Sequence, residues 1–96
     1  MELIDPTALA KALTQLDGWV GDTKGISRTV SLPTFPAAIA AVDRIAVAAE
    51  AIDHHPDIDI RWRTLTLRVT TWEADSHVTD LDLTLAARID AALRDT

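Results

Sequence analysis

The sequence contains no cysteine and only three glycines. The absence of cysteine excludes disulfides and thiolate metal sites, and it suits a cytoplasmic protein. With so few glycines, no glycine-rich loop of the kind that cradles phosphates is present. No apolar run approaches the roughly 20 residues that span a membrane, and residues 1–6 lack the basic and apolar segments of a signal peptide. We therefore expect a cytoplasmic protein that does not enter a membrane.

Basic residues are also scarce. Nine lysines and arginines stand against fifteen acidic residues, which gives a formal net charge of −6. This charge repels a phosphate backbone, and Arg61 with Arg63 is the nearest approach to a basic patch. Nucleic acid is therefore not expected as a direct partner.

The length and the apolar content indicate one folded domain. Apolar residues make up 48% of the 96 residues, which excludes a disordered chain. We expect a single domain over residues 1–96. A chain this short buries only about 60–65% of the surface that its unfolded form exposes. We therefore expect a homodimer or homotetramer that covers part of the remaining apolar surface.

The apolar pattern predicts the element order α-β-β-α-β-β-α. Asp5-Pro6 is typical of a helix start, because aspartate caps the first turn and proline suits its first position. The predicted strands cover about 19–20, 25–32, 58–62 and 65–69, and the longest predicted helix covers 35–53. The apolar parity changes between residues 62 and 65, which predicts a tight turn or a bulge. Paired strands between helices favour an α+β domain, a four-stranded antiparallel sheet with three helices on one face.

The last helix is predicted to begin near Thr79. Thr79 and Asp82 have the spacing of a capping box, with aspartate in place of the usual glutamate. We therefore expect Asp82 to accept a hydrogen bond from the backbone N–H of Thr79.

Two adjacent histidines, His54 and His55, stand at the end of the long predicted helix. Glu50 precedes His54 by one helical turn, and Asp53 and Asp57 flank the pair. These acids and the helix C-terminus favour an imidazolium, so they raise a histidine pKa from its usual value of about 6.5. The two rings oppose each other's protonation, so we expect a neutral histidine beside a charged one near pH 7. Such a pair suits general acid/base catalysis.

Two other interpretations of the pair stay open on the pattern alone. A histidine at a helix C-terminus often only satisfies the last carbonyl groups. A metal site could use His54, His55, His77 and a carboxylate, although the spacing matches no zinc motif. We predict that no metal is bound.

A longer motif surrounds the histidine pair. The run EAIDHHPDIDIRW, from Glu50 to Trp62, is followed by Trp72 and Asp82. It resembles the pterin-4a-carbinolamine dehydratase family. The signature of that family is an acid, three residues, His-His-Pro, an aromatic after five or six residues, histidine or occasionally tryptophan after nine, and a later aspartate.

The resemblance implies an activity, a substrate and a set of site residues. The activity is dehydration of 4a-hydroxytetrahydropterin to quinonoid dihydropterin, without a metal or organic cofactor. It recycles the cofactor of aromatic amino acid hydroxylases, so such a hydroxylase is an implied partner. The implied catalytic residues are His54 as the main acid/base, Glu50 to orient it or tune its charge, His55, and Asp82 as support. The implied pterin-binding residues are His55, Asp57, Trp62 and Trp72.

One position departs from the commonest form of the family. Trp72 stands where most members have a third histidine. Tryptophan cannot transfer a proton at neutral pH, although it can stack on a pterin and donate one hydrogen bond. His77 is close enough in sequence to be a substitute donor, although its expected place in a loop disfavours this role. The intact Glu50 and histidine pair favour an enzyme, whereas Trp72 favours the alternative function, a non-catalytic dimerisation or regulatory module on the same fold.

Overall fold

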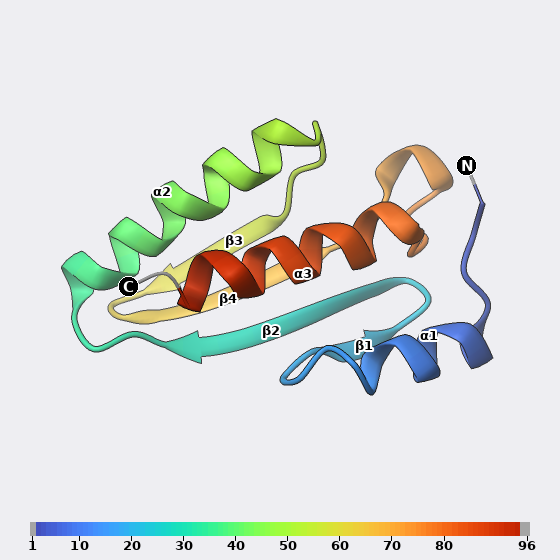
Figure 1. The fold of residues 1–96 in the computed structure, drawn as a ribbon, viewed down its shortest axis with the longest axis horizontal. Helices are drawn as coiled ribbons and strands as arrows, with labels where there is room; N and C mark the ends of the chain where they lie inside the picture. Colours follow the sequence, from blue (N-terminus) through green and yellow to red (C-terminus); the bar gives the residue numbers. More distant parts are fainter. Residues whose placement is uncertain (1, 95–96) are drawn as a thin grey trace.

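The computed structural model describes residues 2–94, and their elements follow the predicted order (Figure 1). The prediction of an α+β domain with a four-stranded antiparallel sheet is therefore confirmed. A short 3₁₀ helix, η1, was not predicted. The elements are α1 (Pro6–Leu13), β1 (Val20–Asp22), β2 (Gly25–Ser31), α2 (Phe35–Ala51), β3 (Asp57–Arg61), β4 (Thr64–Val69), η1 (Trp72–Ala74) and α3 (Asp80–Arg94).

The first two helices begin at side chains that cap their free backbone N–H groups. The carboxylate of Asp5 accepts from Ala8 N–H at 2.8 Å, and the Thr34 hydroxyl accepts from Ala37 N–H at 3.1 Å. A proline follows within the first two positions of each helix. Caps of this kind contribute about 1 kcal/mol each.

The four antiparallel strands lie in the order β1-β2-β4-β3. Arg61 pairs with Thr64, so β3 and β4 are joined by a two-residue turn, Trp62-Arg63. This tight turn explains the predicted change of parity, because it places Ile58 opposite Leu67 on one face of the sheet. Trp62 has φ 55°, in the left-handed region that bulky residues rarely adopt.

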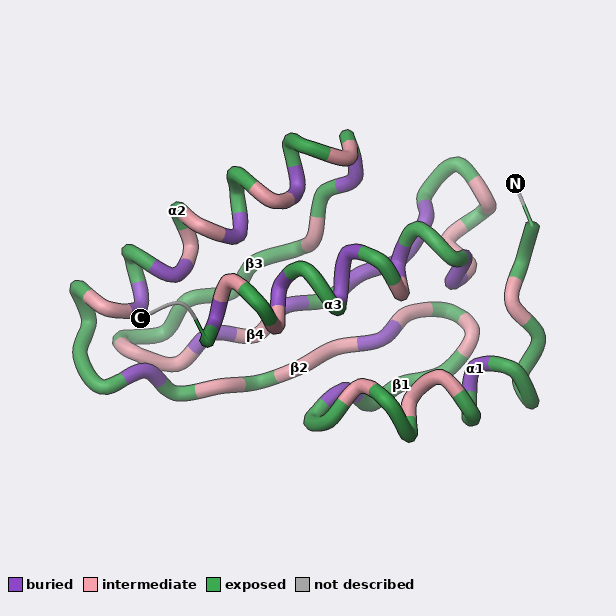
Figure 2. Tube along the Cα trace, in the orientation of Figure 1, coloured by how far each residue is buried: buried purple, intermediate pink, exposed green. Residues whose placement is uncertain are grey.

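The core lies between one face of the sheet and the helices. Figure 2 shows buried positions recurring at each turn of α2 and α3 and along β4. The fully buried side chains include Ile26, Ile45, Leu65, Leu67, Leu85 and Ile89. The opposite face of the sheet is polar, with hydroxyl pairs such as Thr29–Thr66 bridging its strands. A polar cluster buried on the helix side of the sheet is therefore surrounded by apolar side chains.

The outer side of α2 keeps several apolar side chains in contact with solvent, namely Phe35, Ile39 and Val47. Exposed apolar groups on an alanine-rich helix are consistent with the predicted self-association, which stays a prediction. Within residues 2–94, no helix is both long and apolar enough to cross a membrane.

Candidate active site

The segment that follows α2 turns the two histidines in different directions. Asp53 N–H bonds the Glu50 carbonyl at 3.2 Å and His54 N–H bonds the Ala49 carbonyl at 3.1 Å. Between these bonds Asp53 has φ 49°, in the left-handed conformation that usually selects glycine at this position. The helix therefore ends at Ala51, before the predicted residue 53, and His54 is no longer part of its face.

His54 turns inward toward α3. Its Nε2 lies 2.6 Å from Oδ1 of Asp82. The His54 side chain is 8% exposed and the Asp82 side chain is 0% exposed. A carboxylate buried so completely is tolerated only when hydrogen bonds replace its water.

Asp82 receives two further hydrogen bonds on its other oxygen. Oδ2 accepts from the backbone N–H of Thr79 at 2.8 Å and from the hydroxyl of Thr71 at 2.7 Å. The predicted capping contact between Asp82 and Thr79 is therefore confirmed. Asp82 thus caps α3 and also holds His54.

Sequence reasoning missed Thr71, and a signal for it was available. Thr71 follows β4 and continues the inward parity of Leu65, Leu67 and Val69. A polar residue at an inward position must find a buried partner. Thr71 is fully buried, and its partners are Asp82 and Thr79.

His55 turns outward and meets Glu50. Its Nε2 contacts Oε2 of Glu50, and the two side chains are 55% and 75% exposed. This hydrogen bond raises the pKa of His55 above its usual value. Desolvation acts in the opposite direction, and the negative charges of Glu50 and Asp53 add to the increase. His55 is thus the ring of the pair that favours the charged form.

The expected pairing of Glu50 with His54 is wrong. It assumed that the helix continues through His54, so that the two residues share a face four positions apart. The left-handed residue Asp53 removes that relation and brings His55 back to Glu50 instead. The ring of neither histidine caps the carbonyl groups of α2; in the described residues both rings contact carboxylates.

Comparison with known proteins shows the family of the chain. The model of the family described as pterin 4 alpha carbinolamine dehydratase matches residues 2–92. The chain belongs to this family. A relative from Nocardia farcinica, named "Putative pterin-4-alpha-carbinolamine dehydratase", is 50% identical over 97% of each chain. A relative of the same name from Roseiflexus castenholzii is 46% identical over 92% of this chain and 94% of its own.

Two solved structures share the fold. A transcriptional coactivator/pterin dehydratase from Brucella melitensis has a TM-score of 0.87 and 26% identity, covering 96% of this chain and 99% of its own. A pterin dehydratase-like protein identified as a RuBisCO assembly factor in the alpha-carboxysome has a TM-score of 0.65 and 16% identity. That match covers 81% of this chain and 89% of the other chain, and it shows the fold alone.

Trp72 begins η1, directly after Thr71. Trp72, which stands where the family usually has histidine, therefore follows directly after Thr71, a hydrogen-bond partner of Asp82. Trp72 is 64% exposed, so its side chain can contact a ligand at the protein surface.

Asp57 and Trp62 are not among the hydrogen-bond partners of the histidine pair. Asp57 opens β3 opposite Arg68, on the polar face of the sheet, and its carboxylate lies 4.0 Å from the Arg68 guanidinium. Trp62 follows the far end of β3, about 17 Å along the strand, and packs on Arg63. Trp62 is thus distant from the histidine pair within one chain, whereas Asp57 follows His55 by two residues. The role of both in pterin binding stays a prediction.

His77 ties the N-terminal segment to the loop before α3. Its Nε2 lies 3.1 Å from the carbonyl oxygen of Ile4. Backbone bonds join Thr71 to His77 on the other side. The ring is thus occupied by a structural contact, which weakens its candidacy as a substitute proton donor.

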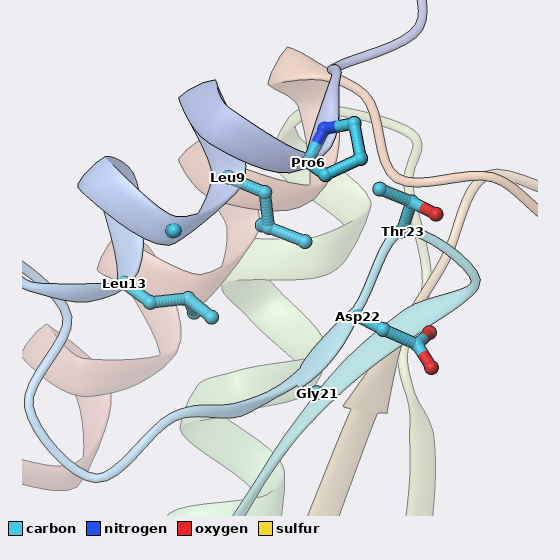
Figure 3. Close-up of a pocket in the computed structure, with 7 residues that line it drawn as sticks. Pro6, Leu9, Leu13, Gly21, Asp22 and Thr23 are labelled. Carbon is cyan, nitrogen blue, oxygen red and sulfur yellow. The ribbon is translucent and has the colours of Figure 1, made fainter.

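The two apolar hollows of the described residues lie away from the histidines. One, of about 300 Å³, lies between α1 and the turn after β1 and is lined by Leu9, Leu13 and Thr23 (Figure 3). The other, of about 480 Å³, lies between α2 and α3. We favour the histidine cluster as the site, because two histidine–carboxylate contacts lie there in one short segment. The hollows are lined mainly by apolar side chains, with separate charged residues such as Asp22 in the first and Arg44 in the second.

Chemically, the cluster offers two different histidines in one short segment. His54 has a buried carboxylate partner that fixes its ring, whereas His55 has an exposed partner that favours its charge. This combination can move a proton and bind a polar ligand at the same surface. Among residues 2–94, no three histidine or acidic side chains cluster as metal ligands. The absence of a metal requirement stays a prediction.

Proposed function

We propose that this protein dehydrates 4a-hydroxytetrahydropterin to quinonoid dihydropterin. The observation that carries the proposal is the buried His54–Asp82 pair beside the exposed His55–Glu50 pair. Membership of the family supports the substrate class. His54, whose ring is held by a buried carboxylate, is also the histidine to which the family motif assigns the acid/base role.

The reaction needs one proton to leave the pterin and one to arrive. The C4a–O bond breaks and the hydroxyl departs as water, taking up one proton. N5 loses its proton as the C4a–N5 double bond forms, so the protons balance. His54 is the general acid/base for this exchange, and Asp82 holds its ring. His55, which favours its charged form, binds and positions the polar pterin.

The proposal is tested by turnover of chemically generated carbinolamine. We expect the wild-type protein to speed its decay well above the rate in buffer, as measured by stopped-flow absorbance. The variant His54→Ala/His55→Ala, shown to be folded by circular dichroism, should return the rate to that of buffer. Equal rates for this variant and the wild type would contradict the proposed site.

The same assay with a chelator tests the metal prediction. We expect EDTA to leave the rate unchanged, because the reaction needs only proton transfers. Loss of activity with EDTA and its return with zinc would show that the histidines serve a metal.

A non-catalytic module is the second candidate function. The observations that favour it are Trp72 at the usual histidine position and the exposed apolar side of α2. A folded wild-type protein that self-associates but does not speed carbinolamine decay would establish this alternative. Both candidates share the expected homodimer or homotetramer, which light scattering measures.

The biological setting that we propose follows from the reaction. Quinonoid dihydropterin is the form that must be reduced to regenerate the cofactor of an aromatic amino acid hydroxylase. We therefore propose such a hydroxylase as the source of the substrate, and the cytoplasm as the location. Carbinolamine decay coupled to a hydroxylase reaction, with and without this protein, checks the first point.

A further inference from the structure

A chain of hydroxyl groups stands behind the Asp82 carboxylate. The Thr71 hydroxyl donates its single proton to Oδ2 of Asp82 at 2.7 Å. Thr79 Oγ1 lies 2.8 Å from Thr71 Oγ1, so Thr79 must be the donor in that contact. Thr79 Oγ1 in turn accepts from Leu81 N–H at 3.3 Å. The hydroxyl proton of Thr79 therefore points to Thr71, and the hydroxyl proton of Thr71 points to Asp82.

The direction of the chain fixes which nitrogen of His54 carries a proton. With two donors on Oδ2, Asp82 suits the ionised form, which accepts hydrogen bonds only. Its Oδ1 therefore requires a donor at Nε2 of His54, 2.6 Å away. A neutral His54 then has its proton on Nε2 and its lone pair on Nδ1.

The other nitrogen of His54 is open to the surface. In the part of the chain that the structure describes, Nδ1 has no hydrogen-bond partner. The one fully buried side-chain nitrogen without a partner among those residues is Nη2 of Arg44. Nδ1 of His54 is therefore in contact with solvent, although the residue as a whole is buried.

We propose that Thr71 and Thr79 are positioning residues that hold Asp82 and thereby keep His54 in its Nε2–H tautomer. Nδ1 is then the nitrogen that exchanges a proton with the substrate. The kinetic part of this inference rests on the proposed dehydration, whereas the tautomer is a property of the free protein.

A matched pair of neighbouring threonines separates positioning from simple stability. Thr70 is also buried, and its hydroxyl donates to the Lys24 carbonyl at 2.9 Å, away from Asp82. Both Thr70→Val and Thr71→Val keep the side-chain shape. Thr70→Val removes one hydroxyl hydrogen bond, whereas Thr71→Val removes the bonds to Asp82 and Thr79. Only Thr71→Val removes a donor from Asp82. Thr71→Ser restores the hydroxyl without the methyl group.

The first measurement is the tautomer of His54, read from the ring ¹⁵N chemical shifts at a pH where the ring is neutral. We expect the wild type, Thr70→Val and Thr71→Ser to show the Nε2–H form, and Thr71→Val to show a mixture. An Nδ1–H form in the wild type would overturn the proposal without any variant. It therefore remains testable even if Thr71→Val fails to fold.

The second measurement is dehydration kinetics. We expect kcat of Thr71→Val to fall about 10-fold with KM nearly unchanged, because outer partners orient the reacting group without touching the substrate. Thr71→Ser should recover most of kcat, and Thr70→Val should match the wild type. A folded Thr71→Val with wild-type kcat and tautomer would overturn the proposal. Absence of turnover in the wild type would instead reject the dehydratase function, and the tautomer measurement would still decide this inference.

Discussion

The two histidines are neighbours in the chain but occupy opposite environments. His54 is buried and pairs with an aspartate 28 residues away on α3, whereas His55 is exposed and pairs with a glutamate of its own helix. One left-handed residue, Asp53, produces this division. The comparison shows that a single backbone turn can give two rings of the same type different partners and different exposure.

The buried pair and the exposed pair also differ in what they contribute to stability. An exposed ion pair contributes little, because water screens it and both side chains lose freedom. A buried carboxylate with three donors is different, because removing any partner leaves another group unsatisfied. Loss of the buried pair should therefore affect both folding and catalysis.

The largest expected effect comes from removing His54. His54→Ala should lower kcat for carbinolamine dehydration by about 10²–10⁴-fold, the usual contribution of a general acid/base. His55→Ala should act mainly on KM, because we assign His55 to binding. Steady-state kinetics on both folded variants checks this. The reverse division, with kcat lost only in His55→Ala, would exchange the two roles.

The next largest effect is the loss of Asp82. Asp82→Ala should lower the free energy of unfolding by about 3 kcal/mol, because Thr71 and Thr79 lose a buried acceptor and His54 loses its partner. This exceeds the 0.5–2 kcal/mol of an ordinary helix cap. Chemical denaturation measures it, with Glu50→Ala as the exposed control. An equally small loss of unfolding free energy in Asp82→Ala and Glu50→Ala would contradict the contrast between the buried and the exposed pair.

Much of the fold follows from local patterns. The helix starts at Asp5-Pro6 and near Thr79, and the tight turn after β3, were predicted because caps and parity depend on short stretches of sequence. The partner of Asp82 at Thr79 was predicted for the same reason.

The partners of the histidines could not be predicted in full. The pairing of Glu50 with His54 failed because nothing local marks Asp53 as left-handed; glycine is the usual signal there. Thr71 was missed because its contact with Asp82 depends on how α3 packs against the end of β4. Such contacts belong to tertiary structure, although the inward parity of Thr71 gives part of the signal.

Replacing Trp72 tests whether the site lacks a second proton donor at the position where most family members have a histidine. With only His54 as acid, one face of the pterin should react faster, so we expect the two 4a-stereoisomers to decay at different rates. Trp72→His should raise the rate of the slower isomer about 10-fold, below the 10²–10⁴-fold of a fully positioned acid. Stopped-flow assays on separated isomers measure this, once the variant is shown to be folded and oligomeric. Equal rates in the wild type would mean that Trp72 does not limit the reaction.

Asp53 tests the turn that separates the two histidines. Asp53→Gly should raise the free energy of unfolding by about 0.5–1 kcal/mol, because glycine adopts a φ of 49° without strain. Asp53→Asn is the control, since it removes the charge and keeps a side chain that tolerates this conformation. Thermal unfolding compares them. A loss of stability in Asp53→Gly would mean that the aspartate side chain contributes more than its strain costs.

The smallest effect concerns the pH dependence of the exposed pair. The hydrogen bond with Glu50 raises the pKa of His55 in the folded protein above its usual value of 6.5. A raised folded pKa means that the pair's stabilisation is complete below about pH 6.5 and is lost as the pH rises through the folded pKa. Glu50→Gln should bring the His55 pKa back toward its usual value and flatten this loss, as measured by NMR titration of the ring protons and by unfolding at several pH values. The buried His54–Asp82 pair provides the contrast, because Glu50→Gln leaves its hydrogen bonds intact and should leave the His54 ring signals in place. A His54 signal that shifts with the His55 signal would show that the two rings titrate as one unit, and the division between them would then be one of geometry and not of charge.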